Sequence, residues 1–436
     1  MRHLDLVLLS VFYASALDTK SRVPPVGHLV EGGPSSIFFL PQDKGDESPA
    51  CLDGSPYGFY FVPSRRNSTK WTITLEGGGW CWDEEDCHKR SLTYLGSSKR
   101  FARKNNGCRC MNVDESGNID GHCNCLILPY CDGASFAGFR EKPWVNPTNT
   151  RELVYFRGIK NFDATMDFAL AHGLDNASEF VLTGGSAGGL SSVVHVDRIA
   201  DRLARTNPKC KVRGVPVGGY FINHDTFKEE FDKNIWRLGS SLSPPTLRMR
   251  TNYTEQLRYV FQMQNLTFGM EGAISAECGK NYPNSPHLCF ISPHMLKFVK
   301  TPIFVFNSRF DSWQLEKILR IDLTRMNQDE HDAVLKYGND FLAQLDNIRS
   351  DSKNGAAITS CICHRCTWNH ITVGDKLSYE HYADWLTGKT SGEASVHVDL
   401  RAPNGNGILN SSLCANYPPK RQDGSFLRLA RHRHQT

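Results

Sequence analysis

A serine stands between glycines in the stretch EFVLTGGSAGGL, residues 179–190. The pattern is Gly-x-Ser-x-Gly with Ser186 at its centre, behind a short apolar run and ahead of the helix-like stretch 188–206. A strand, a sharp turn and a helix form the context in which this pattern presents a nucleophile, because the turn lifts the hydroxyl above the sheet. We therefore predict that Ser186 is a nucleophile, against the alternative of a purely structural turn.

A serine nucleophile needs partners later in the chain. A base must take the hydroxyl proton and an acid must orient that base, and in α/β-hydrolases the acid and then the histidine follow the serine. Asp311 comes just after the apolar run 301–306, so its carboxylate could hold an imidazole. His364, His370 and His381 are the candidate bases that follow it, and chain order does not choose among them.

Three consecutive glycines follow another short strand-like run in the stretch TITLEGGGWCWD, residues 72–83. Acyl transfer creates an oxyanion, which hydrolases stabilise with backbone N–H groups from a glycine-rich loop and from the residue after the nucleophile. Gly78, Gly79 and Trp80 fit the first role and Ala187 fits the second. By itself the glycine run is more typical of an ordinary turn.

The elements that would position these residues alternate along the chain. Strand-like runs are separated by helix-like stretches, which is typical of a parallel sheet with crossover helices. We therefore predict an α/β fold. The strand-like runs are residues 58–62, 71–75, 152–156, 180–182 and 303–306. The helix-like stretches are residues 161–173, 188–206 and 329–350.

Composition limits the classes of protein that remain. The chain has 436 residues, of which 40% are hydrophobic and 22% charged, as in ordinary globular proteins. A net charge of +4 is small for this length and argues against a nucleic-acid-binding protein. No apolar stretch of about 18 residues follows the N-terminal segment, so we expect no transmembrane segment in the mature chain.

Several features predict a secreted protein. Residues 1–16 have a short basic start, a short apolar run and an Ala-Ser-Ala cleavage site, as in a signal peptide; a buried N-terminal helix is the alternative. A single domain would then span residues 17–420, followed by a basic tail at 421–436. The 15 cysteines are many for a cytosolic chain. Five sequons predict N-glycosylation, at Asn67, Asn176, Asn252, Asn265 and Asn410.

Two cysteine clusters raise the question of a metal. A cysteine-rich insertion occupies residues 104–131, and the second cluster is Cys361-x-Cys363-x2-Cys366. Structural zinc sites favour two to four residues between paired cysteines, and an exported chain is oxidised. We therefore predict disulfides in both clusters and no metal. The odd number of cysteines leaves at least one thiol unpaired within the chain.

Six blocks in a fixed order carry a family resemblance: LEGGGWCW, YCDGASF, LVYFRG, GGSAGGL, FDSWQ and SCICH. They span about residues 50 to 380 and resemble the pectin acetylesterase family, which includes plant pectin acetylesterases and animal Notum. The resemblance implies an α/β-hydrolase-like fold with a mostly parallel central sheet flanked by helices. It also implies secretion and serine esterase chemistry without metal or cofactor.

The resemblance also assigns roles to residues of this chain. It implies Ser186 as nucleophile, Asp311 as triad acid and His364 as triad base. The oxyanion loop falls on Gly78, Gly79 and Trp80, with Ala187 opposite. One departure concerns a block after the nucleophile helix, where the family usually has an acidic residue and this chain has Gly218. Cys363, directly before His364, is also unusual.

These observations favour a secreted carboxylic-ester hydrolase that removes O-acetyl groups from a polysaccharide such as pectin. The first alternative is a Notum-like deacylase that removes a fatty acyl group from a secreted protein. An alternative of another class is an inactive secreted glycan-binding protein. The expected partner is thus an acylated polysaccharide or an acylated secreted protein, and we expect the enzyme to be a monomer.

Overall fold

The computed structural model describes residues 35–42, 47–105, 107–112, 121–227, 252–269, 272–366 and 371–400. The predicted signal peptide and the predicted basic tail lie outside these residues. The same is true of His370, of the sequon at Asn410 and of part of the cysteine-rich insertion. These predictions therefore remain predictions.

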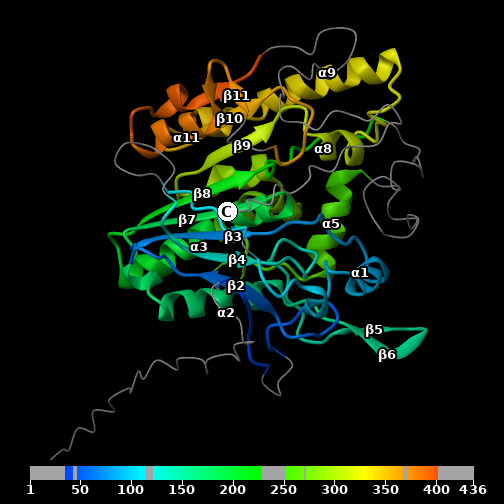
Figure 1. Ribbon diagram of the computed structural model, residues 1–436. Helices are drawn as coiled ribbons and strands as arrows, with labels where there is room; N and C mark the ends of the chain where they lie inside the picture. Colours follow the sequence, from blue (N-terminus) through cyan, green and yellow to red (C-terminus); the bar gives the residue numbers. More distant parts are fainter. Residues whose placement is uncertain are drawn as a thin grey trace, which may run out of the picture.

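The described residues form a central sheet of nine strands in the order β1-β2-β4-β3-β7-β8-β9-β10-β13 (Figure 1). All neighbours from β4 to β13 pair in parallel, whereas β2 pairs antiparallel with both β1 and β4. The strands are β1 Ile37–Phe39, β2 Gly58–Val62, β3 Lys70–Leu75, β4 Asn124–Leu128, β7 Glu179–Gly185, β8 Lys211–Val217, β9 Phe304–Ser308, β10 Gly355–Thr359 and β13 Val396–Val398. The predicted α/β fold with a mostly parallel sheet is confirmed.

Two expectations from the sequence are confirmed only in part. The run at 152–156 overlaps a strand, β6 (Asn149–Val154), but β6 pairs only with β5 (Trp144–Asn146) in a separate hairpin and not with the central sheet. This hairpin projects from one side of the molecule in Figure 1. The cysteine-rich segment 104–131 is not only an insertion, because it contains β4, which pairs with both β2 and β3. A second small hairpin joins β11 (Thr372–Val373) and β12 (Lys376–Leu377).

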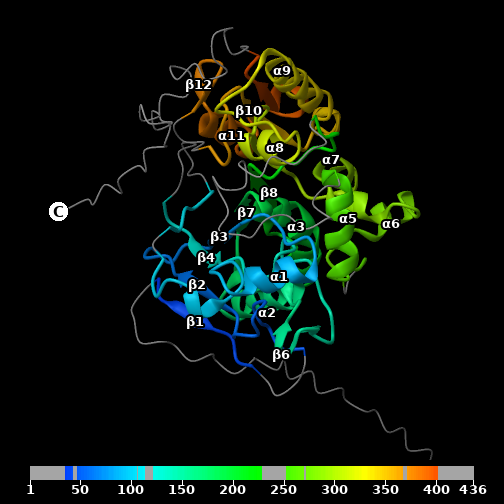
Figure 2. The ribbon, with the colours of Figure 1, turned by 90° about the vertical axis from the view of Figure 1, so that its right-hand side faces the viewer.

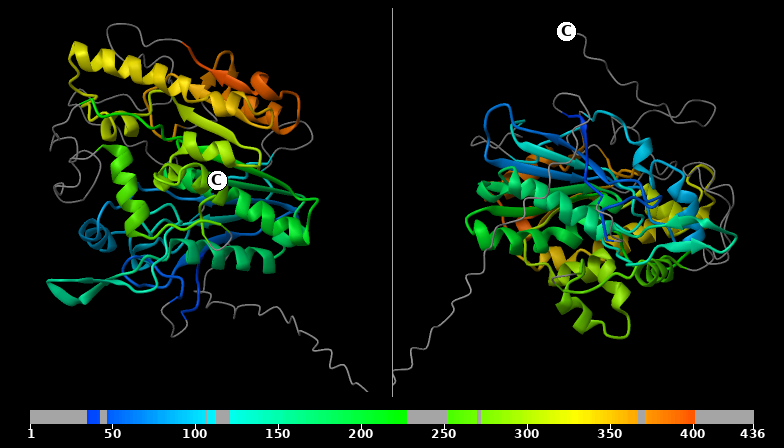
Figure 3. Two further views of the ribbon diagram at one scale, coloured as in Figure 1. Left: turned by 180° about the vertical axis from the view of Figure 1, so that it is seen from behind. Right: turned by 90° about the horizontal axis from the view of Figure 1, so that it is seen from below.

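Helices cover both faces of the sheet. The helices α2 (Gly158–Ala171) and α3 (Ala187–Thr206) lie over one face, which the view from behind shows (Figure 3, left). The helix α11 (Ser378–Leu386) covers the other face, where Tyr382 and Trp385 pack against Phe304. The other helices are α1 Glu84–Ser91, α5 Tyr253–Met263, α6 Ala276–Asn281, α7 Ser292–Met295, α8 Ser312–Lys317, α9 Gln328–Ala343 and α10 Asp346–Arg349. Short 3-10 turns occur at Ser98–Arg100, Leu174–Asn176, Pro286–Phe290, Leu296–Phe298 and Gly392–Ser395.

The strand β7 shows why this sequence forms a buried parallel sheet. Phe180 and Leu182 belong to the large apolar cluster on the α2 and α3 side, whereas Val181 belongs to the cluster under α11. All three side chains are almost completely buried. A strand that is covered on both faces has apolar side chains at successive positions, because both sides of the strand are buried, and β7 has this pattern. Within the described residues, no helix is long and apolar enough to cross a membrane.

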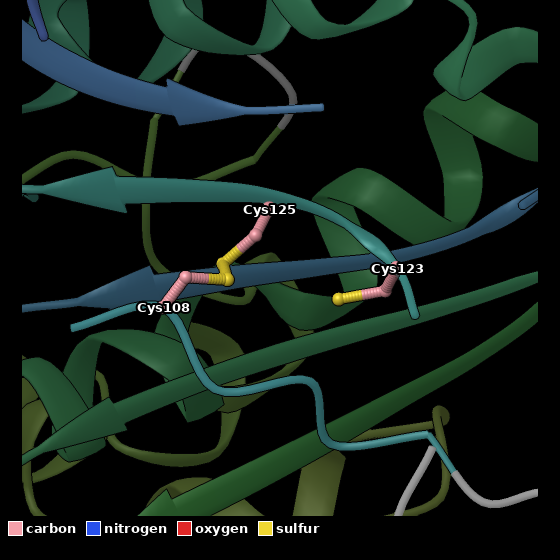
Figure 4. Close-up of side chains that lie close together, drawn as sticks. All are labelled: Cys108, Cys123 and Cys125. Carbon is pink, nitrogen blue, oxygen red and sulfur yellow. A yellow bond between two sulfur atoms is a disulfide. The ribbon is translucent and has the colours of Figure 1, made fainter. Parts of the chain in front are cut away.

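Disulfides tie the loops to this framework. The pairs are Cys51–Cys131, Cys81–Cys87, Cys108–Cys125, Cys110–Cys123, Cys278–Cys289 and Cys363–Cys366. Cys361 is also disulfide-bonded, whereas Cys210 is free and half-buried. The predicted disulfides in both clusters are confirmed. The Sγ atoms of Cys108, Cys123 and Cys125 lie together because two disulfides are neighbours there (Figure 4).

Candidate active site

Ser186 occupies a strained turn between β7 and α3. Its φ and ψ are 60° and −128°, in a region that non-glycine residues rarely adopt. The turn is tight: a Cβ on Gly184 would lie 2.2 Å from the carbonyl oxygen of Gly188, and one on Gly188 would lie 2.1 Å from that of Leu75. The flanking glycines are therefore required, and the hydroxyl stands at the C-terminal end of the sheet.

Asp311 and His364 are brought together by two neighbouring strands. Asp311 follows β9 and caps the N-terminus of α8, accepting a hydrogen bond from the Gln314 N–H at 3.0 Å. His364 follows β10, and its Nδ1 lies 2.8 Å from Asp311 Oδ2 and 3.0 Å from Oδ1. When Nδ1 carries the proton and donates to this carboxylate, Nε2 is left as the basic nitrogen. Among the described residues, Nε2 makes no hydrogen bond.

The other candidate histidine has a different environment. The Nε2 atom of His381 lies 2.8 Å from the carbonyl oxygen of Val373, and its ring stacks on His397 at 3.7 Å. His381 belongs to α11, and its side chain is buried. Of the two described candidates, only His364 contacts Asp311.

The loop that carries His364 reaches across the strand ends to the serine turn. Arg365 packs so closely on the residue before Ser186 that a Cβ on Gly185 would lie 2.3 Å from Arg365 Nε. A Cβ on Gly218 would lie 3.0 Å from the Arg365 backbone nitrogen. The absence of an acidic side chain at position 218 thus leaves the space that the histidine loop fills. The Cys363–Cys366 disulfide closes this loop.

Gln314 is a buried residue that sequence reasoning missed. Its side-chain amide donates to the Tyr220 carbonyl at 3.0 Å, and its Oε1 accepts from the Ile222 N–H at 3.0 Å and the Tyr337 hydroxyl at 2.7 Å. It therefore fixes the start of α8, where Asp311 lies, to the loop after β8 and to α9. Its place in the block FDSWQ was the available signal.

The glycine loop after β3 is fixed by hydrogen bonds that its carbonyl groups accept from two side chains. Arg90, on α1, donates from Nη2 to the Gly78 carbonyl at 2.8 Å, and the Tyr130 hydroxyl donates to the Gly79 carbonyl at 2.8 Å. In a trans peptide the N–H points opposite to the carbonyl. The N–H groups of Gly79 and Trp80 therefore point away from Arg90 and Tyr130, and neither donates a hydrogen bond within the described part of the chain.

A hydrogen-bonded chain links this loop to the residue after the serine. The Trp80 indole N–H donates to Ser135 Oγ at 2.9 Å, and Ser135 Oγ donates to the Ala187 carbonyl at 2.9 Å. The Ser135 N–H donates to the Tyr130 hydroxyl, also at 2.9 Å. The block YCDGASF thus holds both predicted oxyanion segments in one arrangement.

The same block contains a buried carboxyl group. Asp132 Oδ2 accepts hydrogen bonds from the Ala134 N–H at 3.0 Å and the Phe136 N–H at 2.9 Å. Burial nevertheless raises the pKa of Asp132 to about 6, because the charged form is poorly solvated there. This carboxyl fixes the turn that carries Ser135.

Four aromatic side chains pack beside His364. Trp80, Phe221 and Trp313 contact one another with ring centroids 5.1, 5.2 and 5.5 Å apart, and Tyr253 lies 6.1 Å from Trp80. Phe221 and Trp313 are each 6.3 Å from the His364 ring. We call these four residues the aromatic cluster. Figure 2 looks onto this side of the molecule, where α1, α5 and α8 lie.

Four of the predicted glycosylation acceptors are described. Asn67, Asn176, Asn252 and Asn265 are all exposed. Asn252 also caps α5, where its Oδ1 accepts the Glu255 N–H at 2.9 Å. Their accessibility is compatible with glycosylation, which remains a prediction.

Comparison with known proteins gives the family. The family model named Pectinacetylesterase matches residues 35–407. The chain belongs to the pectinacetylesterase family. Pectin acetylesterase 11 of Arabidopsis thaliana is 31% identical over 360 residues, which cover 77% of this chain and 83% of that protein. Pectin acetylesterase 5 of the same plant is 29% identical over 359 residues, which cover 77% of this chain and 76% of that protein.

Notum proteins are more distant members of the same group. The palmitoleoyl-protein carboxylesterase NOTUM of Drosophila melanogaster is 26% identical over 74% of this chain and 45% of that protein. The solved structure of the Wnt deacylase Notum from Drosophila has a TM-score of 0.66 at 24% identity, covering 84% of this chain and 96% of that one. This likeness confirms the α/β-hydrolase-like fold. By name, both groups are carboxylic-ester hydrolases, so the family places this chain among them.

Proposed function

We propose that this protein is a secreted serine carboxylic-ester hydrolase that removes O-acetyl groups from a polysaccharide such as pectin. Ser186, His364 and Asp311 would form its catalytic triad. The observation that carries this proposal is the contact of His364 Nδ1 with Asp311 at 2.8 Å, in a loop that packs against the strained Ser186 turn. The disulfides and the exposed sequons support secretion.

In this mechanism, Ser186 Oγ attacks the ester carbonyl while His364 Nε2 takes the hydroxyl proton. Asp311 stabilises the resulting imidazolium. The N–H groups of Gly79, Trp80 and Ala187 would bind the oxyanion. Those of Gly79 and Trp80 donate no hydrogen bond within the described residues. The imidazolium then gives its proton to the sugar oxygen of the ester, and the sugar leaves as a free hydroxyl, so that an acetyl-serine remains. Water, deprotonated by His364, attacks this ester and releases acetate and free Ser186.

The aromatic cluster supports a short acyl group. Its rings lie at ordinary contact distances, and Trp80, Phe221 and Tyr253 are almost completely buried. Among the described residues, these rings therefore leave no space between one another for a long chain. A two-carbon acyl group needs no such space, whereas a palmitoleoyl chain needs an apolar channel. The names of the plant relatives favour the same choice.

The test compares chain lengths. Wild type and Ser186→Ala are secreted from a eukaryotic host and assayed on p-nitrophenyl acetate, butyrate, octanoate and palmitate. We expect wild-type kcat/KM to be highest for acetate and to decrease with each longer chain, and Ser186→Ala to lose about 10³-fold or more of the activity. A maximum at octanoate or longer would favour the deacylase alternative. Equal inactivity of both folded proteins, with retained glycan binding, would favour the binding protein.

A further inference from the structure

Ser308 is a buried serine beside both of the loops that carry the proposed acid and base. It is the last residue of β9 and pairs with Thr359, the last residue of the neighbouring strand β10 (Figure 1). Asp311 lies in the loop after β9, and His364 lies in the loop after β10. Ser308 is only 2% exposed, and the mechanism proposed above does not use it.

The Ser308 hydroxyl makes a hydrogen bond to each of these loops. Its Oγ accepts from the backbone N–H of Phe310, the residue before Asp311, at 3.0 Å. The same hydroxyl donates to the backbone carbonyl of Cys361, in the loop that leads to His364. A serine hydroxyl can donate and accept at once, so one side chain links the two loops.

Two backbone hydrogen bonds also connect the loops. The Arg309 N–H donates to the Thr359 carbonyl at 3.0 Å, and the Ser312 N–H donates to the Cys363 carbonyl at 3.4 Å. The first lies at the end of the strands and the second is long for a hydrogen bond. Between them, the spacing of the loops depends on the Ser308 hydroxyl.

Removing this hydroxyl would take a hydrogen-bond partner from one buried backbone group in each loop. Phe310 and Cys361 are 1% and 3% exposed, so water does not readily replace the hydroxyl. Both groups would then favour an arrangement that gives them other partners, because an unpaired buried polar group is costly. Movement of either loop changes the contact between Asp311 and His364, which is 2.8 Å in this arrangement.

We propose that Ser308 is a positioning residue, which sets the distance between Asp311 and His364 by linking their loops. It acts through these two residues and not on the substrate. The proposal rests on the catalytic triad of the proposed function and adds the residue that aligns it. Displacing a catalytic group by about 1 Å costs about 10² in rate. Loss of the hydroxyl should therefore lower kcat far more than it changes substrate binding.

The experiment compares four variants with the wild type. Ser308→Ala removes the hydroxyl without adding volume, whereas Ser308→Thr and Ser308→Val have the same shape and only threonine keeps the hydroxyl. Thr72→Val, on β3 and outside both loops, is the matched control. The buried Thr72 hydroxyl also accepts a backbone N–H, that of Met111 at 3.1 Å, and donates to Asn112 Oδ1 at 3.0 Å. Thermal unfolding of each variant checks that it is folded.

We expect Ser308→Ala and Ser308→Val to lower kcat on p-nitrophenyl acetate about 10²-fold, with KM changed less than about twofold. Ser308→Thr should keep a kcat at least about tenfold above that of Ser308→Val, because it retains the donor and acceptor. Thr72→Val should change kcat less than about twofold even if it lowers the unfolding temperature, because it lies outside both loops.

A second measurement does not depend on activity. The Nδ1 proton that His364 donates to Asp311 should give a far-downfield signal in the proton NMR spectrum of the wild type. Its absence from His364→Gln identifies this signal. We expect Ser308→Thr and Thr72→Val to keep the signal, and Ser308→Ala to lose it or shift it upfield.

Several results would overturn this inference alone. They are a normal kcat in folded Ser308→Ala, an equal kcat in Ser308→Thr and Ser308→Val, an equal loss in Thr72→Val, and a loss of kcat with an unchanged NMR signal. If Ser308→Val does not fold, Ser308→Ala takes its place in the comparison with Ser308→Thr. Failure of the proposed function is distinct. The wild type would then not hydrolyse p-nitrophenyl acetate, whereas the NMR signal would still report whether Ser308 aligns the pair.

Discussion

At the scale of the residue, Asp132 gives the clearest pH-dependent prediction. Its pKa is raised from 3.8 to about 6 by burial, so the native state binds this proton more tightly than the unfolded chain does. The free energy of unfolding should therefore decrease as pH rises from about 4 to 6, by about 3 kcal/mol from this group. Asp132→Asn keeps an oxygen acceptor for the two N–H groups and cannot ionise.

The measurement is urea unfolding of wild type and Asp132→Asn at pH 4 and pH 7. We expect the variant to gain stability relative to wild type between these two values, because only wild type must ionise a buried carboxyl. Comparing the two proteins cancels the titration of all other groups. A difference between them that does not change with pH would contradict the prediction.

Individual residues differ in how far their roles could be predicted from sequence. The strained turn at Ser186 and the glycines around it could be predicted, because such a turn leaves a local pattern, whereas the nucleophile role stays a prediction. His364 could not be chosen from His370 and His381 by position, since the choice depends on which loop meets Asp311 in space. Gln314 and Arg90 were missed because their partners are distant in sequence, at Tyr220, Tyr337 and Gly78.

At the scale of the element, the loop after β3 depends on the block YCDGASF. The Tyr130 hydroxyl both donates to the Gly79 carbonyl and accepts from the Ser135 N–H. Tyr130→Phe should loosen the peptide that carries the Trp80 N–H. Losing an oxyanion donor outright costs about 10²–10³ in kcat, so partial misorientation should cost about tenfold. KM should change less than about twofold.

Tyr60→Phe is the matched control for this prediction. Its hydroxyl also donates to a backbone carbonyl, that of Ala102 at 2.5 Å, but from β2 and away from Ser186. Steady-state kinetics on p-nitrophenyl acetate, with thermal unfolding alongside, separates the two effects. The same change in kcat for both variants, or a rise in KM with normal kcat, would show that Tyr130 does not position the proposed oxyanion donors.

Some elements could be predicted and others could not. The strands β2, β3, β7 and β9 are apolar runs, and α2 and α3 have a clear apolar stripe. β4 was missed because it lies among cysteines and polar residues, and its strand character comes from pairing between β2 and β3. The run at 152–156 has the right residue types but pairs in a hairpin, which local propensity does not decide.

At the scale of the whole molecule, disulfides of very different span connect the chain. Cys51–Cys131 closes a loop with a sequence separation of 80, whereas Cys81–Cys87 has a separation of 6. Chain-entropy arguments give about 4–5 kcal/mol of stabilisation for the long loop and about 2 kcal/mol for the short one. Replacing Cys51 and Cys131 by alanine should therefore lower the unfolding free energy about twice as much as replacing Cys81 and Cys87.

Denaturant unfolding of the two double variants under non-reducing conditions tests this order. Equal losses, or a larger loss for the short loop, would mean that local strain or packing outweighs loop closure. The sequence predicted that the cysteines would pair, but not which pairs would form. Pairing depends on the positions of β4 and of the glycine loop, which only the folded chain defines.

Cys210 is the free cysteine among the described residues, and its burial has a kinetic consequence. Burial raises the pKa of Cys210 to about 11, so very little of it is thiolate at neutral pH. Thiol–disulfide exchange proceeds through the thiolate. An odd thiol in a chain with this many disulfides could otherwise attack a neighbouring bond and reshuffle the pairs. Once the chain has folded, the Cys210 thiol is a slow nucleophile, so its exchange with the disulfides of the chain is slow.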